Sequence, residues 1–296
     1  MSVHSRCLLL AGFVLIGTTV AADPVRKEAE VNGVTIPYVE EGTGEPVVFL
    51  HGAVSDFRAW DAIRSDISDD RHFIAPAMRY HGTGDWPDEG ENYSIAGHAE
   101  DMAAFIEGLG LGPVHLVGWS MGGDVATALA LKNPDLIQSL ILYEGAPWTM
   151  IDKEANAAAW DAMDNRLAGV PAAVEDGDAE KATRLLIEGV FQMDPGGFDS
   201  LPSDFREMML ANARTMPIFW TGPAYEPTCE MLKQFDKPVL LVHGGDSIDI
   251  WRLANETTAD CLPQAEIATL NGVNHDGPMR DPAGFAAMIE KFVASH

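Results

Sequence analysis

The sequence predicts an α/β fold with a mostly parallel central sheet, helices on both faces and a helical lid insertion. Short apolar runs that are typical of buried strands alternate with segments of helical periodicity. The run Pro46 to Leu50 is continuously apolar, as expected of a parallel strand that is covered on both faces. The interval 146–226 lacks such a run and is rich in Ala, Asp, Met and Trp, which indicates a helical insertion.

Each strand is predicted from its own local pattern. Asn32-Gly33 interrupts the segment 31–39 and is a turn signal for a hairpin. Further strands are expected at 46–50, 72–76, 114–117, 139–143, 238–242 and 265–270. The central strands are expected to form one core, built from residues 23–145 and 227–296.

Helices are predicted where apolar residues recur at a spacing of three or four. One such pattern includes Met102, Phe105, Ile106 and Leu109, and another covers 124–131. The last helix opens at Asp281-Pro282, a capping residue followed by an N1 proline. The insertion 146–226 is expected to form a lid over the carboxyl ends of the strands, where open α/β sheets bind ligands.

Composition limits the classes of partner. The chain has 296 residues, 47% of them hydrophobic, which is enough for a substantial core. Nineteen Lys and Arg against 45 Asp and Glu give a formal charge of −26, which repels phosphate backbones and anionic headgroups. We therefore expect a small-molecule substrate, no nucleic-acid partner, and a monomer or small homo-oligomer.

The amino terminus is typical of a signal peptide. Arg6 precedes an apolar run over residues 7–17, and small residues lead to Ala22. This run is too short to span a bilayer comfortably, and Asp23 and Pro24 follow at once. We expect residues 1–22 to be removed and the mature chain to be periplasmic or secreted, without membrane insertion after cleavage.

Two cysteines, Cys229 and Cys261, remain in the expected mature chain. They either form a disulfide, which an oxidising compartment permits, or stay as two buried thiols. No Cys or His spacing typical of zinc ligands occurs, so no metal site is expected. No Gly-x-Gly-x-x-Gly follows the first strand, which argues against a dinucleotide, and no cofactor is expected.

The most informative motif is Gly118-Trp119-Ser120-Met121-Gly122. It lies directly after a predicted strand and directly before a predicted helix, which is the context of a nucleophile elbow. The sharp turn strains the backbone of Ser120, and small neighbours at Gly118 and Gly122 let the helix approach the strands. Ser120 is therefore the candidate nucleophile.

With this motif, the sequence resembles the α/β-hydrolase superfamily, in its serine-nucleophile branch. The resemblance covers essentially the whole mature chain, from the run ending in His51-Gly52 to Asn274-His275-Asp276. In this family an acid and then a histidine follow the nucleophile along the chain, which implies His275 as the base. The family's acid commonly follows the seventh strand, but Ser247 stands at that position here. The resemblance implies either Glu144, after the sixth strand, which we favour, or Asp246.

The resemblance also implies the remaining parts of the site. The oxyanion hole would use the backbone N–H groups of Ala53 and Met121. Trp119, Tyr80 and Trp148 are candidates for the substrate pocket, together with the aromatic residues of the insertion: Trp160, Phe191, Phe198, Phe219 and Trp220.

The implied activity is hydrolysis of a carboxylic ester or lactone through an acyl-enzyme on Ser120, with a small, uncharged or apolar substrate. The related epoxide hydrolases and haloalkane dehalogenases use an aspartate nucleophile, so a serine argues against both. Two alternatives stay open. The first is carbon-carbon bond hydrolysis or perhydrolysis on the same triad, and the second is a non-catalytic ligand-binding protein of this fold.

Overall fold

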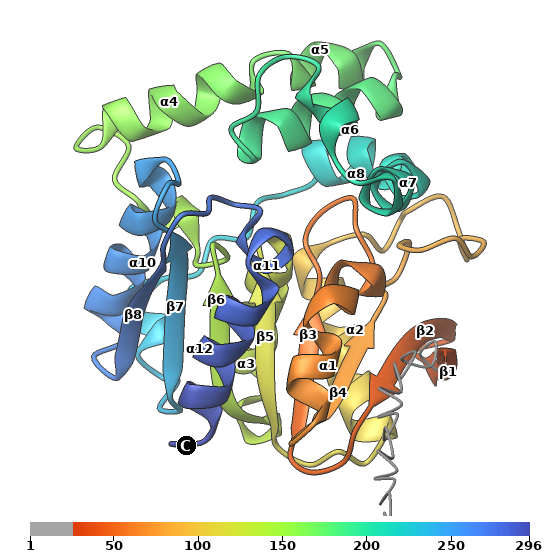
Figure 1. Ribbon diagram of the computed structural model, residues 1–296, viewed down its shortest axis with the longest axis vertical. Helices are drawn as coiled ribbons and strands as arrows, with labels where there is room; N and C mark the ends of the chain where they lie inside the picture. Colours follow the sequence, from red (N-terminus) through yellow and green to blue (C-terminus); the bar gives the residue numbers. More distant parts are fainter. Residues whose placement is uncertain (1–25) are drawn as a thin grey trace, which may run out of the picture.

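The computed structural model describes residues 26–296, and its centre is an eight-stranded sheet (Figure 1). The expected signal peptide, residues 1–22, lies outside the described residues. The strands follow the order β1-β2-β4-β3-β5-β6-β7-β8. Only the β1–β2 and β2–β4 pairs are antiparallel. The predicted α/β fold with a mostly parallel sheet is confirmed.

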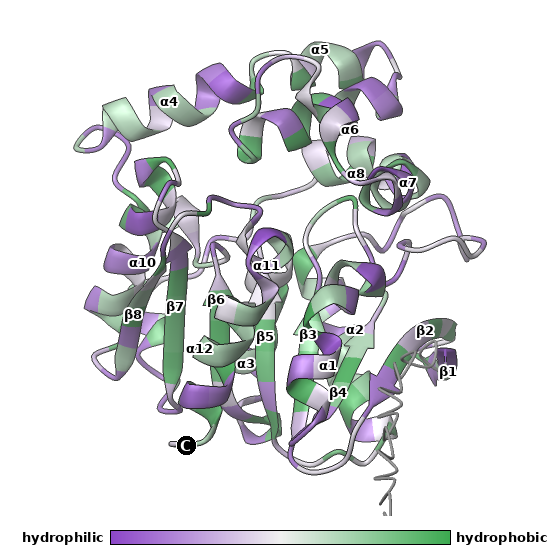
Figure 2. Cartoon of the chain, in the orientation of Figure 1, coloured by the Kyte–Doolittle hydropathy of each residue, from purple (hydrophilic) through white to green (hydrophobic). Residues whose placement is uncertain are grey.

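The strand bounds agree closely with the local sequence patterns. The strands are β1 (Arg26–Val31), β2 (Val34–Glu41), β3 (Pro46–Leu50), β4 (His72–Pro76), β5 (Val114–Trp119), β6 (Ile137–Tyr143), β7 (Val239–Gly244) and β8 (Ala265–Leu270). At the predicted hairpin turn, Asn32 and Gly33 have φ values of 47° and 78°, as a two-residue turn between twisted strands requires. Figure 2 shows that the central strands are predominantly hydrophobic, since helices cover both of their faces.

Helices on both faces bury the sheet. The α-helices are α1 (Asp61–Ser68), α2 (Ile95–Gly108), α3 (Met121–Lys132), α4 (Ala157–Leu167), α5 (Val170–Glu175), α6 (Ala179–Val190), α7 (Ser203–Ala211), α8 (Met216–Thr221), α9 (Cys229–Leu232), α10 (Asp249–Cys261), α11 (Gly277–Arg280) and α12 (Pro282–Val293). Short 3-10 helices are η1 (Phe57–Trp60), η2 (Pro134–Leu136), η3 (Trp148–Met150), η4 (Gly197–Ser200) and η5 (Ala213–Thr215). Helices α1 and α12 cover one face, and α2, α3 and α10 cover the other (Figure 1).

The segment 146–226 contains helices α4 to α8 and no strand, and every residue in it is described. In Figure 1 these helices lie above the carboxyl ends of the strands. The segment therefore has the helical character and the position that the sequence analysis expected of a lid.

A disulfide joins Cys229, the first residue of α9, to Cys261, the last residue of α10. Their Cα atoms are 5.2 Å apart, and the two residues are separated by 32 positions in the chain. The bridge fastens the segment that returns from the lid to the helix before β8. Within residues 26–296, none of the helices combines the length and the apolar composition needed to cross a bilayer.

Candidate active site

Ser120 lies in the sharp turn between β5 and α3, at the carboxyl end of a central strand. Its φ of 54° and ψ of −125° fall in a region that non-glycine residues rarely occupy. The Ser120 N–H donates to the Tyr143 carbonyl at 3.1 Å, and the Ser120 carbonyl accepts from the Gly123 N–H at 2.7 Å. These bonds hold the strained turn, and Ser120 is partly exposed to the cavity above it.

Glycines allow α3 to approach the neighbouring strands. A Cβ on Gly118 would lie 2.5 Å from the Gly122 carbonyl oxygen, and one on Gly122 would lie 2.3 Å from the Leu50 carbonyl oxygen. Gly123 and Gly145 pack backbone to backbone, because a Cβ on Gly123 would lie 2.3 Å from the Gly145 carbonyl oxygen. The sequence singled out Gly118 and Gly122, whereas Gly123 and Gly145 emerge only from the packing of α3 against the end of β6.

His275 lies in the loop between β8 and α11, and its imidazole contacts the carboxyl group of Glu144. The distance between His275 Nδ1 and Glu144 Oε2 is 2.7 Å, and both side chains are buried. A carboxylate at Nδ1 fixes the tautomer that carries its proton there, so Nε2 is left free to accept a proton. The structure thus brings together the predicted base and the favoured acid.

Glu144 is held by further donors. Its Oε1 accepts a hydrogen bond from the Gly244 N–H at 2.7 Å and another from the Ser247 hydroxyl. The backbone adopts a φ of 42°, and the Glu144 N–H donates to the Val242 carbonyl at 2.9 Å. The sequence analysis noted Ser247 only as the residue that stands where the family commonly has its acid. In the structure, the Ser247 hydroxyl contacts the carboxylate of Glu144.

Asp246, the alternative acid, is exposed to solvent. Its hydrogen bonds are made by its backbone: the N–H donates to the Val273 carbonyl at 2.9 Å, and the carbonyl accepts from Gln192 Nε2 at 2.6 Å. The carboxyl group in contact with His275 is that of Glu144.

Two tryptophans fix the position of His275. Trp251 stacks on the imidazole with ring centroids 4.6 Å apart and planes at 14°. Trp119 Nε1 donates to the His275 carbonyl at 3.0 Å. Trp251 belongs to α10, a helix that the sequence analysis did not predict. The helical spacing of residues 250, 251, 254, 258 and 261 was the signal that could have revealed it.

A cavity of about 580 Å³ lies between the carboxyl ends of the strands and the lid. Ser120 and His275 both line it, as do the predicted pocket residues Trp119 and Trp148. The lid contributes four more of the expected aromatic residues: Trp160, Phe191, Phe219 and Trp220. The exception is Phe198, which is fully buried in the apolar core that joins the lid to the sheet.

The predicted oxyanion residues, Ala53 and Met121, also line the cavity. Met121 is the first residue of α3, and N–H groups in the first turn of a helix have no intrahelical acceptor. Ala53 follows Gly52, where an added Cβ would lie 3.4 Å from Ser120 Cβ. The loop after β3 and the start of α3 therefore both border the cavity beside Ser120.

Tyr80 is a correction to the sequence analysis, because it does not line the cavity. Its hydroxyl donates to Asp88 at 2.7 Å, and its ring packs edge-on against Trp86 with centroids 5.0 Å apart. The φ of 71° at Tyr80 turns its side chain into the loop that follows β4. Tyr93, further along that loop, lines the cavity instead.

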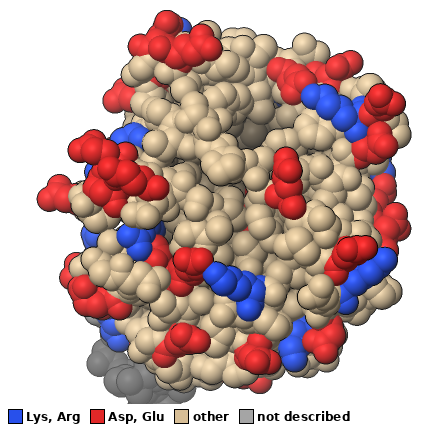
Figure 3. Space-filling model, turned by 180° about the vertical axis from the view of Figure 1, so that it is seen from behind, with Lys and Arg blue, Asp and Glu red and all other residues tan. Residues whose placement is uncertain are grey.

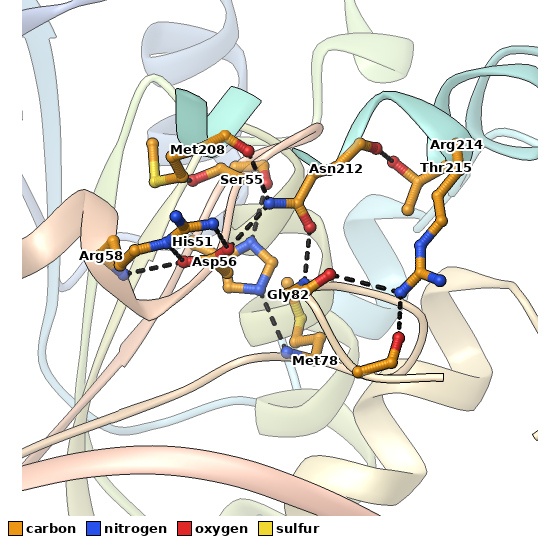
Figure 4. A network of polar contacts seen from close by, with 12 residues as sticks. His51, Ser55, Asp56, Arg58, Met78, Gly82, Met208, Asn212, Arg214 and Thr215 are labelled. Atoms are coloured by element: carbon orange, nitrogen blue, oxygen red, sulfur yellow. Dashed lines mark hydrogen bonds and ion pairs between the residues drawn. The ribbon is translucent and has the colours of Figure 1, made fainter. Parts of the chain in front are cut away.

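A buried polar network ties the lid to the loops that follow β3 and β4 (Figure 4). Asn212, which follows α7, donates through Nδ2 to Asp56 at 2.8 Å and accepts through Oδ1 from the Gly82 N–H at 2.6 Å. Asp56 also binds the Arg58 guanidinium, with Oδ2 2.7 Å from Nη2. Since Asp56 follows β3 closely, the lid and the loop that carries Ala53 are fixed to each other.

Burial changes the charge state of several groups. It lowers the pKa of His51 and of His98 to about 4, so both are neutral at pH 7. Burial raises the pKa of the Asp124 carboxyl, in the cavity wall, well above its usual range. The acidic residues Asp124, Glu144 and Asp164 line the cavity, and no Lys or Arg of the described chain does.

Metal ligation is not evident at this site. Within residues 26–296, no group of three or more His, Cys, Asp or Glu side chains is arranged to hold a metal ion. The chemistry that the arrangement can perform is that of a serine hydroxyl, an imidazole, a carboxylate and backbone amides.

Comparisons with known proteins agree with the observed fold. Residues 45–279 match the family described as alpha/beta hydrolase fold. The chain is 26% identical to 2-(acetamidomethylene)succinate hydrolase of Mesorhizobium japonicum, over 85% of this chain and 88% of that protein. It is 29% identical to non-heme chloroperoxidase CPO-A1 of Kitasatospora aureofaciens, over 82% and 90% respectively. The solved structure of epoxide hydrolase CorEH superposes with a TM-score of 0.73 at 19% identity, covering 92% of this chain and 99% of that one.

Proposed function

Because this chain belongs to the alpha/beta hydrolase fold family, we propose that it is a serine hydrolase that cleaves a carboxylic ester or lactone of a small, uncharged substrate. In this proposal Ser120 is the nucleophile, His275 the general base and Glu144 the acid that orients the imidazole. The observation that carries it is the buried His275–Glu144 pair, 2.7 Å between Nδ1 and Oε2, in the wall of the cavity that Ser120 also lines.

In this proposal the reaction has two stages, formation of an acyl-enzyme and its hydrolysis. His275 Nε2 takes the proton from Ser120 as the Ser120 oxygen attacks the carbonyl carbon, and Glu144 stabilises the imidazolium. The oxyanion accepts hydrogen bonds from the N–H groups of Ala53 and Met121. The alcohol leaves with the proton from His275, which gives the acyl-enzyme. A water molecule, deprotonated by His275, then attacks the acyl carbon, so that the acid is released and the Ser120 hydroxyl is restored.

The charge around the cavity supports an uncharged substrate. The name of one relative specifies a succinate, which carries two carboxylates. No Lys or Arg of the described residues lines the cavity of this chain, so none is available to pair with such carboxylates. Acidic side chains are also distributed over the molecular surface, as Figure 3 shows for one face, and the formal charge is −26. Anionic substrates are disfavoured in such a field.

A second candidate activity is perhydrolysis, which the similarity to a non-heme chloroperoxidase favours. It would use the same acyl-enzyme, attacked by hydrogen peroxide in place of water. The two activities differ only in the acceptor, so a direct competition between water and peroxide separates them.

Labelling with a fluorophosphonate tests the nucleophile. We expect stoichiometric inactivation with a single adduct on Ser120, and no adduct in Ser120→Ala. Ser55 and Ser94 line the same cavity and serve as internal controls. An adduct on either of them, or on any residue other than Ser120, contradicts the assignment.

A panel of chromogenic esters and lactones of graded chain length, assayed with and without peroxide, then tests the reaction. We expect hydrolysis of uncharged esters or lactones and slower turnover of their carboxylated analogues. Labelled Ser120 without turnover of any substrate would instead support a ligand-binding protein.

A further inference from the structure

The cavity has a polar corner, formed by Asp124 and Tyr225, that the proposed reaction does not use. Asp124 comes one helical turn after Met121, so it lies on the same side of α3, about 4.5 Å further along the helix axis. Tyr225 belongs to the segment that follows α8, and its carbonyl accepts a hydrogen bond from the Thr149 hydroxyl at 2.8 Å. The core helix and the chain returning from the lid thus bring both side chains to one cavity.

Neither group of the polar corner is satisfied within the protein. Among residues 26–296, no hydrogen bond or ion pair involves the Asp124 carboxyl group or the Tyr225 hydroxyl. Burial is the only cause that raises the pKa of Asp124, so no charged neighbour perturbs this carboxyl group appreciably. Burial, and then the nearby Asp124 carboxyl, raise the pKa of Tyr225 to about 12. Both residues line the same cavity.

Asp124 and Tyr225 are both partly exposed, and the cavity around them is lined by apolar residues such as Trp148, Trp160 and Met163. A polar group that faces a ligand cavity without a partner in the protein can form a hydrogen bond with a ligand that occupies the cavity. Ligand cavities are typically apolar with a few placed polar groups that fix the orientation of the ligand. Asp124 and Tyr225 match that description, and within the described chain neither side chain has a hydrogen-bonding partner that would explain its polar group at this position.

The chemistry of the two groups indicates the class of ligand. Burial raises the pKa of Asp124 and so favours its protonated form, which offers one O–H donor and one carbonyl acceptor, and a phenol offers one donor and one acceptor. Such a pair complements a neutral group that both donates and accepts, namely a hydroxyl or an amide. A carboxylate ligand would face the acidic lining, and an ammonium ligand would require Asp124 to ionise in an apolar wall.

We propose that Asp124 and Tyr225 bind an uncharged hydroxyl or amide group of the substrate, at a distance from the scissile carbonyl. The substrate is then an ester or lactone that carries such a group, and not a plain hydrocarbon ester. This inference rests on the proposed function, because it specifies the substrate class of the same site.

Paired covalent probes test the inference. Fluorophosphonates with alkyl chains of several lengths are made with a terminal hydroxyl or a terminal methyl group, and their rates of modification of Ser120 are compared. At the length that reaches the polar corner, we expect the hydroxyl probe to react about tenfold faster in the wild type. The ratio should fall to about one in Asp124→Leu. It should survive in Asp124→Asn, because an amide also donates and accepts, and decrease in Tyr225→Phe.

Asp164→Leu is the matched control, since Asp164 is an exposed carboxyl residue that lines the same cavity, and the ratio should be unchanged in it. Equal rates for both probes at every length, or an unchanged ratio in Asp124→Leu, overturn the inference and leave the nucleophile assigned. Preference for a trimethylammonium probe that is lost in Asp124→Asn overturns it in favour of a cation site. Absence of any adduct on Ser120 overturns the proposed function itself. If Asp124→Leu does not fold, Tyr225→Phe gives the same comparison.

Discussion

Replacement of Glu144 by Gln tests the arrangement around His275 most directly. Glu144 Oε1 accepts from the Gly244 N–H at 2.7 Å and from the Ser247 hydroxyl, so the single carbonyl oxygen of Gln is held on that side. The NH₂ group of Gln then takes the place of Oε2, 2.7 Å from His275 Nδ1. A donor at that place requires Nδ1 to accept, so the imidazole proton moves to Nε2. His275 can then no longer take the proton from Ser120.

We expect kcat/KM to fall about ten-thousandfold in Glu144→Gln, as on the triad template when the acid is replaced by its amide. At 1.36 kcal/mol for each factor of ten, this is a loss of about 5.5 kcal/mol of transition-state stabilisation. The assay is the hydrolysis of the best chromogenic ester at saturating and subsaturating concentrations. Asp246→Asn is the control: its carboxyl is exposed, so activity should stay within about twofold of the wild type.

Near-normal activity in Glu144→Gln, together with a collapse in Asp246→Asn, would refute this reasoning and place the acid after β7. Similar partial losses in both variants would mean that either carboxyl group can support His275. Thermal unfolding of each variant is measured first, because a buried carboxylate with three donors also stabilises the loops around it. A large loss of activity is attributed to catalysis only when the unfolding temperature is unchanged.

Three further predictions concern the fold. The Cys229–Cys261 bridge closes a loop of about 32 residues, so its removal should lower the free energy of unfolding by about 4 kcal/mol. Two free thiols in the natively isolated protein would contradict the presence of the bridge. Gly123→Ala should lower the free energy of unfolding by about 1–3 kcal/mol in denaturant titrations and reduce the labelling of Ser120. In the control Gly108→Ala the added Cβ meets no atom within 4 Å, so neither quantity should decrease. His98 has a pKa lowered to about 4 by burial, so its contribution to stability is complete above pH 6.5 and is lost as the pH falls toward 4. The apolar variant His98→Phe should therefore show a smaller loss of unfolding temperature between pH 6.5 and 4.5; an identical pH dependence would contradict this.

Local patterns determined much of the fold. The strand β8 has the predicted bounds, 265–270, and β3 and β4 begin and end at the predicted residues. The bounds of these strands could be predicted from the sequence because burial requires a run of apolar residues in each strand. That requirement does not depend on which other strand it pairs with. The elbow at Ser120 was likewise local, since its glycines are required within a few residues of the turn.

Only the tertiary structure decided which side chains meet at the ends of those strands. Glu144 and Asp246 both follow a strand, and the contact with His275 depends on the pairing of β6 with β7 and on a φ of 42° at Glu144. Tyr80 was expected in the pocket but turns into its own loop, while Tyr225 reaches the cavity from a segment 101 positions beyond Asp124 in the chain. Periodicity records whether a residue is buried, but the direction of a loop side chain is set by the packing of distant elements.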